Sequence, residues 1–214
     1  MSGKLRFALC GVVLCTLASC VESDRPLSDA LKSEQDSRLD GLWSLTNKQG
    51  DVEYLHIGAE ASEPVDRNRV EPEPGMMRYC TITHSHQARG LGKAGEGHFF
   101  RTKIDGEDFA NWVIPADEAK HKPMTYCFLK YSVDEKQLVM WDQDAEATAK
   151  AIEAGKLKGV VQRKKNQGKS ATAEFDELRI TDSTENIAAF FAAGGAKSCF
   201  PDKASAKIVY TRVR

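Results

Sequence analysis

The feature that most constrains the fold is a succession of short segments rich in β-branched and aromatic residues. Residues typical of turns lie between them. Segments of this kind favour the strands of an antiparallel sheet or barrel. They span residues 52–57, 77–83, 98–104, 109–114, 125–133, 137–141, 158–162, 173–180 and 206–214. The clearest hairpin joins 125–133 to 137–141 through Asp134-Glu135-Lys136. The pattern predicts one mostly β domain over residues 39–214.

Two segments break the β pattern and predict short helices. Residues 145–154 are Ala-rich, follow Asp144 and stop at Gly155, as expected of a capped helix. Residues 183–193 follow Asp182 with an acidic residue three positions later, which is a variant of the capping box, and Gly194-Gly195 comes directly after them. The apolar side chains of this second helix can pack one face against the sheet.

The two ends of the domain resemble those of lipocalin-like (calycin) proteins. Gly41-Leu42-Trp43 opens the first apolar run, and Tyr210-Thr211-Arg212-Val213-Arg214 stands in the last predicted strand. In that family the first-strand Trp packs beneath an Arg from the last strand and closes an eight-stranded barrel, so the resemblance implies contact between Trp43 and Arg212. The expected fold class is mostly β (β-rich α+β), either an antiparallel sheet or a lipocalin-like barrel, with two short helices.

The first twenty residues have the features of an export signal. Lys4 and Arg6 form a positive n-region, and the apolar stretch 7–17 is too short to cross a bilayer but fits a secretory h-region. Leu17-Ala18-Ser19-Cys20 resembles the lipobox of bacterial lipoproteins, whose Cys thiol receives a diacylglyceryl group before a signal peptidase cuts in front of it. The resemblance implies a signal peptide over 1–19 and a lipid anchor on Cys20. Ordinary cleavage after Ala18 is the alternative.

The anchor predicts where the protein resides. Two or three acyl chains hold a protein stably at a membrane, because each buried methylene contributes about 0.8 kcal/mol. In the lipoproteins an Asp after the Cys favours the inner membrane, so Val21 favours the periplasmic face of an outer membrane, where the cell has one. The stretch 21–38 is polar and lacks aromatic residues, so we expect residues 20–38 to form a lipidated, flexible tether.

The cysteine count changes once the leader is set aside. Of six cysteines, three lie within residues 1–20, and the body keeps Cys80, Cys127 and Cys199. Two strand cysteines in an oxidising compartment can pair if their Cα atoms lie about 4.4–6.8 Å apart. Cys80 and Cys127, each in the middle of a predicted strand, are the favoured disulfide, and either could pair with Cys199 instead.

No motif in the chain predicts an enzyme, a metal site or a cofactor. His84 and His86 are spaced like a metal pair, but no H-E-x-x-H or C-x-x-C accompanies them, so exposed histidines are the simpler interpretation. The chain contains no G-x-S-x-G and no G-x-G-x-x-G. A net charge of −1, without a long run of one sign, argues against a nucleic-acid surface.

The expected function is non-enzymatic binding at the bacterial envelope, either of a small apolar ligand or of a protein partner. If the barrel holds a ligand, the candidate lining residues are the aromatics Trp43, Tyr54, Phe100 and Trp112. The same side chains could instead fill a solid core. The alternatives are an envelope inhibitor or assembly factor that acts through the loops 60–75 and 84–97, and, third, an enzyme.

Overall fold

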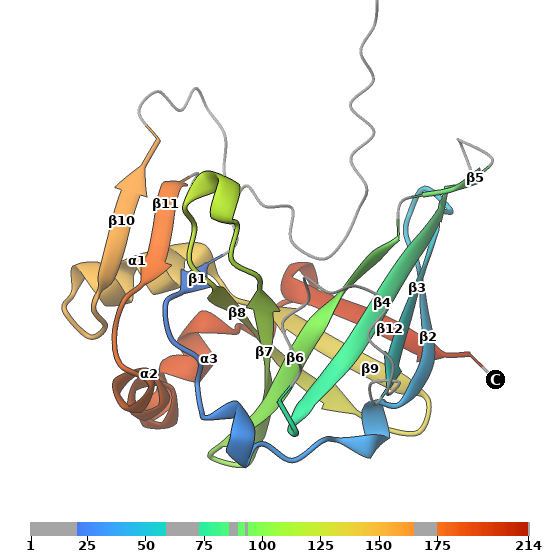
Figure 1. The fold of residues 1–214 in the computed structure, drawn as a ribbon, viewed down its shortest axis with the longest axis horizontal. Helices are drawn as coiled ribbons and strands as arrows, with labels where there is room; N and C mark the ends of the chain where they lie inside the picture. The colour runs from blue at the N-terminus through green and yellow to red at the C-terminus, as the bar shows by residue number, and fades with distance from the viewer. Residues whose placement is uncertain (1–20, 59–72, 86–89, 93, 165–174, 214) are drawn as a thin grey trace, which may run out of the picture.

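The computed structural model describes residues 21–58, 73–85, 90–92, 94–164 and 175–213, and a closed β-barrel dominates them (Figure 1). Around the barrel the strands are β8 (Thr125–Val133), β7 (Glu107–Ile114), β6 (Gly95–Ile104), β4 (Met76–Ser85), β3 (Val52–Gly58), β2 (Gly41–Thr46), β12 (Lys207–Arg212) and β9 (Gln137–Asp142). Each strand pairs antiparallel with the next, and pairing of β8 with β9 closes the eight strands. The predicted mostly β fold is therefore confirmed, in its barrel form.

The barrel strands follow the sequence pattern closely. In β3, buried and more exposed residues alternate, as expected of a strand with one face in a core. The predicted hairpin joins β8 to β9, where the Asp134 carboxylate accepts hydrogen bonds from the backbone N–H groups of Lys136 and Gln137, both at 2.7 Å. The short β5 (Gly90–Leu91) pairs with β4 beyond the barrel wall.

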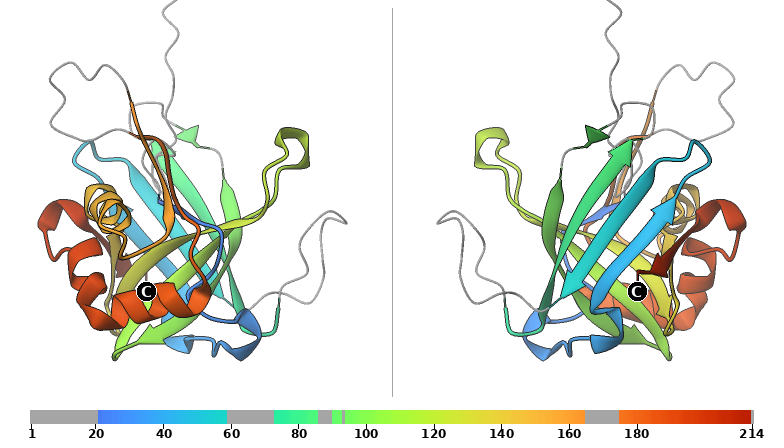
Figure 2. Two further views of the ribbon diagram at one scale, coloured as in Figure 1. Left: turned by 90° about the vertical axis from the view of Figure 1, so that its left-hand side faces the viewer. Right: turned by 90° about the vertical axis from the view of Figure 1, so that its right-hand side faces the viewer.

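A second layer covers one side of the barrel (Figure 2). The sheet continues past β8 through β1 (Glu22–Ser23), β11 (Phe175–Ile180) and β10 (Gly159–Arg163), next to the helices α1 (Ala145–Glu153), α2 (Thr184–Phe190) and α3 (Ala196–Cys199). Phe109 and Phe128 point out of the barrel wall into this layer, where their rings contact Phe191. The molecule thus has an inner core inside the barrel and an outer core beside it.

The two predicted helices are present, with one change at each end of the second. The Asp144 carboxylate caps α1, as predicted, by accepting from Ala147 N–H at 2.9 Å. The cap of α2 is Ser183 instead of Asp182, whose carboxylate accepts from the backbone N–H groups of Lys158 and Ser183. Gly194 has a φ of 97° inside a π-turn that leads on into α3, so the glycines redirect this helix without ending the helical region.

Short 3₁₀ turns complete the described elements: η1 (Ala30–Lys32), η2 (Ser37–Leu39), η3 (Glu118–Lys120) and η5 (Ala204–Ala206). None of the helices in the described ranges combines the length and the hydrophobicity that crossing a bilayer requires.

The prediction of a flexible tether is wrong for residues 21–38. Val21 and Leu27 are 3% and 2% exposed in the outer core, and Leu39 is 1% exposed in the inner core. The backbone N–H of Leu27 donates to the buried side chain of Asn111 at 2.7 Å, and the segment then passes beneath the barrel (Figure 1). The apolar residues of this segment are too widely spaced to form a periodic pattern. The sequence of residues 21–38 alone therefore predicts a flexible tether.

The two leucines at positions 27 and 31 test this packing. We expect Leu27→Ala to lower the free energy of unfolding by about 2–4 kcal/mol, because it removes a fully buried side chain and leaves a cavity. Leu31→Ala is the matched control, since Leu31 is 63% exposed and its replacement should cost less than about 0.5 kcal/mol. Urea unfolding of the full chain, followed by tryptophan fluorescence, measures both. If both variants lowered the free energy of unfolding by the same small amount, the segment would be a flexible tether as predicted from the sequence.

Candidate binding site in the barrel

One end of the barrel, here called the base, is closed by the contact that the calycin resemblance implied. The guanidinium of Arg212 lies 4.0 Å from the centroid of the Trp43 ring, which is fully buried. It also donates hydrogen bonds of 2.6 Å to the backbone carbonyls of Arg38 and Asp40. The indole N–H of Trp43 donates to the carbonyl of Leu39 at 2.8 Å. The first and last barrel strands and the N-terminal segment therefore meet at one point.

A charged network completes the base. The Asp36 carboxylate, 4% exposed, accepts two hydrogen bonds from Arg38 and one of 2.9 Å from the hydroxyl of Tyr131. Arg101 and Arg38 both bind the carboxylate of Asp108. Burial raises the pKa of Asp36, but the bonds from Arg38 and Tyr131 and the two arginine charges outweigh it and hold the pKa below its usual value. The base is thus sealed by satisfied polar groups.

The structure places two of the four predicted lining residues inside the barrel. Trp43 and Trp112 belong to the inner core, whereas Tyr54 and Phe100 lie on the outer face, because their neighbours Leu55 and Phe99 point inward. Phe100 packs there with Ala30, Met76 and Val113. The prediction that Tyr54 and Phe100 line the interior is therefore wrong. Residue type suggested them, but the alternation along each strand decides which face a side chain takes.

Aromatic rings fill the middle of the barrel. The ring of Trp112 stacks on Phe99, with centroids 5.0 Å apart, and meets the ring of Tyr79 edge-on. A Cβ on Gly97 would approach the hydroxyl of Tyr79 to 2.6 Å, so this glycine is what lets the tyrosine ring lie across β6. Towards the other end, here called the upper end, the inward positions carry smaller residues, among them Thr81, Thr83 and Gly95.

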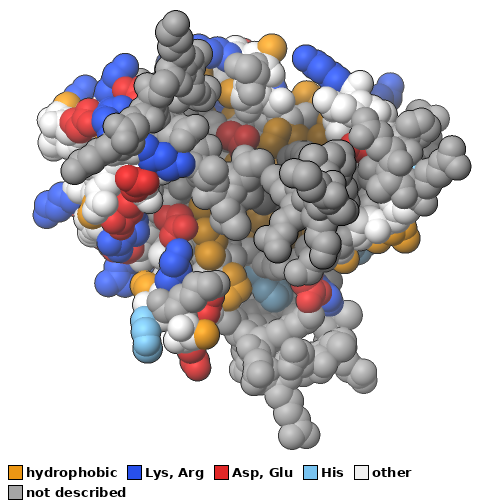
Figure 3. All heavy atoms as spheres, turned by 90° about the horizontal axis from the view of Figure 1, so that it is seen from above, with side chains coloured by type: hydrophobic (Ala, Val, Ile, Leu, Met, Phe, Trp, Pro, Cys, Tyr) orange, Lys and Arg blue, Asp and Glu red, His pale blue; other side chains and the backbone are white. Residues whose placement is uncertain are grey.

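The upper end is where β7 stops at Ile114 and β8 starts at Thr125. Seen from above, hydrophobic side chains are visible in the recessed centre of this face, and charged side chains gather to one side of it (Figure 3). The interior is therefore closed by the Trp43–Arg212 contact at the base, packed with aromatic rings in its middle, and lined by smaller side chains towards the upper end.

One inward-facing carboxyl breaks the apolar lining. Glu53 lies on β3 between inward-facing neighbours and is 4% exposed. Its Oε1 accepts a 2.5 Å hydrogen bond from the hydroxyl of Tyr210, and its Oε2 is buried without a hydrogen-bond partner among the described residues. Burial raises the pKa of Glu53 to about 7, although the bond from Tyr210 lowers it. The buried indole N–H of Trp112 also has no hydrogen-bond acceptor within the described part of the chain.

Sequence reasoning missed Glu53 and Tyr210. A signal was present, since the alternation of V-E-Y-L-H-I puts Glu53 on the same face of the strand as Leu55 and Ile57. A charged residue on the apolar face of a strand marks a candidate site, because a buried carboxyl is costly unless it is paired.

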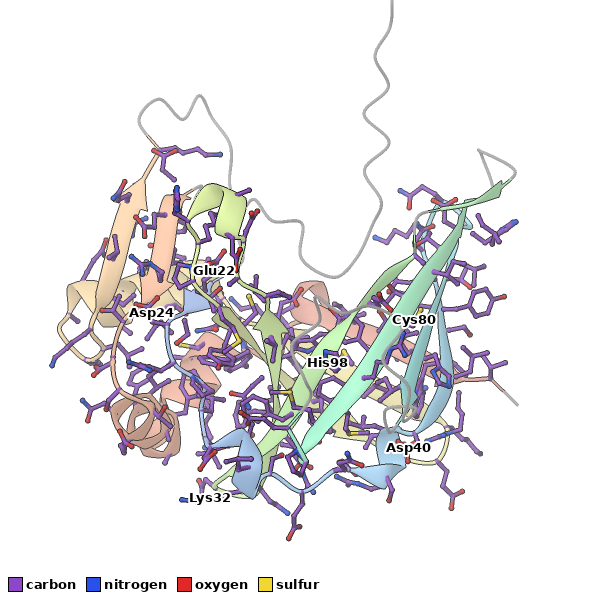
Figure 4. The ribbon with its side chains drawn as sticks, viewed as in Figure 1. Glu22, Asp24, Lys32, Asp40, Cys80 and His98 are labelled. Atoms are coloured by element: carbon purple, nitrogen blue, oxygen red, sulfur yellow. The ribbon has the colours of Figure 1, made fainter. Side chains whose placement is uncertain are left out.

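The predicted disulfide between Cys80 and Cys127 is wrong. Cys127 points into the barrel from β8, whereas Cys80 points outward from β4 (Figure 4), and two strands, β6 and β7, separate them. Cysteines whose Cβ atoms point apart across such a distance cannot be bridged. Cys199 is buried in the outer core, and burial raises the pKa of its thiol, although a hydrogen bond from Thr148 lowers it.

Other surfaces offer less to a ligand. His84 is exposed and His86 lies outside the described residues, and within the described ranges no group of three or more His, Cys, Asp and Glu side chains is placed to hold a metal ion. A groove of about 730 Å³ separates the N-terminal segment from β6 and α2. Its lining mixes four basic side chains with three acidic ones, so no strong charge of one sign develops: Arg25, Lys32, Arg101 and Lys103 with Asp29, Glu34 and Glu185.

Comparison of the chain with protein-family models, with curated proteins and with solved structures finds no match. The barrel interior therefore has to be interpreted from its own chemistry.

The raised pKa of Glu53 makes a prediction about stability. A carboxyl whose pKa is about 7 in the folded chain and 4.5 otherwise favours the fold while it is protonated. This contribution is complete below pH 4.5 and is lost as the pH rises through 7. We expect the wild type to lose up to about 3 kcal/mol of unfolding free energy through this group over that interval.

Glu53→Gln should remove this dependence, because the amide does not titrate. Urea unfolding at a series of pH values between 4.5 and 8 would show the stability of the variant rising relative to the wild type as the pH increases. Glu34→Gln, at an exposed position, is the control and should leave the wild-type profile in place. Parallel profiles for the wild type and Glu53→Gln would contradict the prediction.

Proposed function

We propose that this chain is a lipid-anchored protein of the bacterial envelope whose barrel binds a small molecule with a largely apolar body. The observation that carries the proposal is the barrel interior, which is sealed at one end, lined with aromatic rings, and supplied with two buried polar atoms that lack partners among the described residues. Ligand sites in proteins combine an apolar lining with a few convergent polar groups in this way.

The lipid anchor is inferred from the lipobox, and the fold determines where on the barrel this anchor would be attached. Cys20 is bonded to Val21, which is 3% exposed, and β1 follows at once with its pairing to β8 and β11. Glu22 accepts a hydrogen bond from Thr125, at the upper end of the barrel, well above Asp40 at the base (Figure 4). A lipid on Cys20 would hold the barrel against the bilayer without a spacer, with its base pointing away from the point of attachment.

The alternative of an inhibitor or assembly factor acting through its loops has less support from the described residues. Of the two predicted loops, 60–75 lies mostly outside them, whereas much of 84–97 is described and forms the end of β4, β5 and the start of β6. The large apolar side chains that are exposed in the described part of the chain lie on separate elements, apart from Leu42 and Val213, whose backbones bond to each other.

Processing of the chain tests the anchor. We expect the mature wild-type protein to begin at Cys20 and to carry the mass of two or three acyl chains, as measured by intact-mass spectrometry of the detergent-extracted protein. Cys20→Ser should abolish cleavage at this position and the added mass, because the hydroxyl cannot replace the thiol. Cys15→Ser, inside the leader, should be processed normally. Normal processing and membrane attachment of Cys20→Ser would refute the anchor.

Co-purification tests the binding function. We expect native mass spectrometry of the wild type, extracted gently from its own membranes, to show a bound small molecule. Thr81→Phe should lose the bound mass, since this inward residue has a small side chain on the upper part of the lining. Thr211→Phe, which points outward from β12, is the control that should keep it. Absence of any bound mass, or equal retention in both variants, would argue against a ligand in the barrel.

A further inference from the structure

The carboxyl of Glu53 is only half satisfied. One oxygen has the hydroxyl of Tyr210, and the other, Oε2, is buried without a partner in the described structure. Across the strands, its register neighbours are Leu45 on β2 and Thr83 on β4, and no charged side chain is paired with it there. An ionised carboxylate in such surroundings leaves a full charge unpaired, and a protonated one leaves a donor unused. Either state lacks one partner.

That missing partner is not a basic side chain of the described residues. Burial and the hydrogen bond from Tyr210 are what move the pKa of Glu53, and no Lys or Arg of the described ranges contributes to the shift. Another buried carboxylate shows the contrast, because Asp36 at the base is held by Arg38 and Tyr131 and lies near Arg101. Among the described residues, arginine side chains therefore pair with the buried carboxyl of Asp36, whereas no basic side chain pairs with that of Glu53.

We propose that the ligand of the barrel carries a protonated amine, and that this ammonium group donates to Oε2 of Glu53. The inference rests on the proposed function and adds the class of ligand to it. A charge-assisted hydrogen bond to a carboxylate is among the strongest that a buried site can form. An aromatic face close to a cation adds to the attraction, and Tyr210, which bonds to Glu53, supplies a ring beside this carboxyl.

The same carboxyl selects against other apolar molecules. A fatty acid or another carboxylate would place two negative groups in one apolar interior, which is unfavourable because neither charge is solvated. A neutral alcohol can donate to Oε2 but does not neutralise its charge. The indole N–H of Trp112 remains as a donor for an acceptor atom on the ligand.

Binding of the ammonium is coupled to loss of a proton from Glu53. When the carboxyl is protonated, its proton must leave to solvent before the ammonium N–H can donate to an ionised Oε2. Among the described residues, β12 contributes the titratable Tyr210, whose pKa burial raises, and Asp142 at the end of β9 acts on that tyrosine. β2 contains no titratable residue, and the inward β4 neighbours Thr81 and Thr83 do not titrate in this range.

Three probes with the same aromatic body and different head groups test the proposal: 2-phenylethylamine, 2-phenylethanol and 3-phenylpropionate. Isothermal titration calorimetry on the full chain in nonionic detergent at pH 8 should show the amine binding roughly tenfold or more tightly than the alcohol, with the acid weakest. Glu53→Gln keeps the shape of the side chain and an acceptor for Tyr210, and it should abolish the preference for the amine. Glu34→Gln, at an exposed site, should retain it.

A second readout separates the charge from the shape of the site. At pH 6, where Glu53 is largely protonated, titrations in buffers of different ionisation enthalpy should report release of nearly one proton per bound amine. No proton should be released in Glu53→Gln or on binding of the alcohol. A fold defect in the variant would be recognised because alcohol binding would be lost as well.

The outcomes distinguish a failure of the amine inference from a failure of the proposed binding function. Equal binding of amine and alcohol, unchanged in Glu53→Gln, would overturn the amine inference and leave a barrel that binds apolar molecules. Tightest binding of the acid would overturn the inference in the same way. If none of the probes binds, the amine inference fails for bodies of this size, and the co-purification experiment decides the binding function independently.

Discussion

The contact between Arg212 and Trp43 is the one on which the rest of the structure depends. A sheet that curls into a barrel has to join its first and last strands, and β2 and β12 share only two paired residues at their lower ends. The single guanidinium covers the indole face and donates to three backbone carbonyls, those of Arg38, Asp40 and Glu135. It fixes the seam of the barrel and the chain that runs beneath it at the same time.

The N-terminal segment makes the barrel and its second layer one unit. Val21 and Leu27 are buried in the outer core, and Leu39, at the end of the same segment, is buried in the inner core. Along the edge of β8 that faces away from β7, the first residues pair with β1 and the later residues pair with β9. An anchor on Cys20, as proposed, would therefore be coupled directly to the barrel wall, whereas a flexible linker would let the domain move independently of the membrane.

The strands, the hairpin at Asp134 and both main helices could be predicted, because each depends on local pattern and turn chemistry. The contact of Trp43 with Arg212 was also predictable, but only through the resemblance to a family. Tyr54 and Phe100 were misplaced because their size outweighed the alternation of the strands around them. The packing of residues 21–39 and the separation of Cys80 from Cys127 depend on contacts between distant parts of the chain, which no local pattern reports.

Burying the carboxyl of Glu53 costs free energy of folding, and its contacts within the described fold offset this only in part. An apolar side chain in its place would avoid burying a carboxyl, and replacing buried charges with well-packed apolar residues is often neutral or stabilising. Tyr210 meets only half of the hydrogen-bonding capacity of the group, in contrast to the fully paired Asp36 at the base. Function can require a residue that lowers the stability of the fold, because stability and activity trade off at such sites. The same barrel therefore holds one carboxyl that the fold completes and one that, in the amine-binding proposal, a ligand would complete.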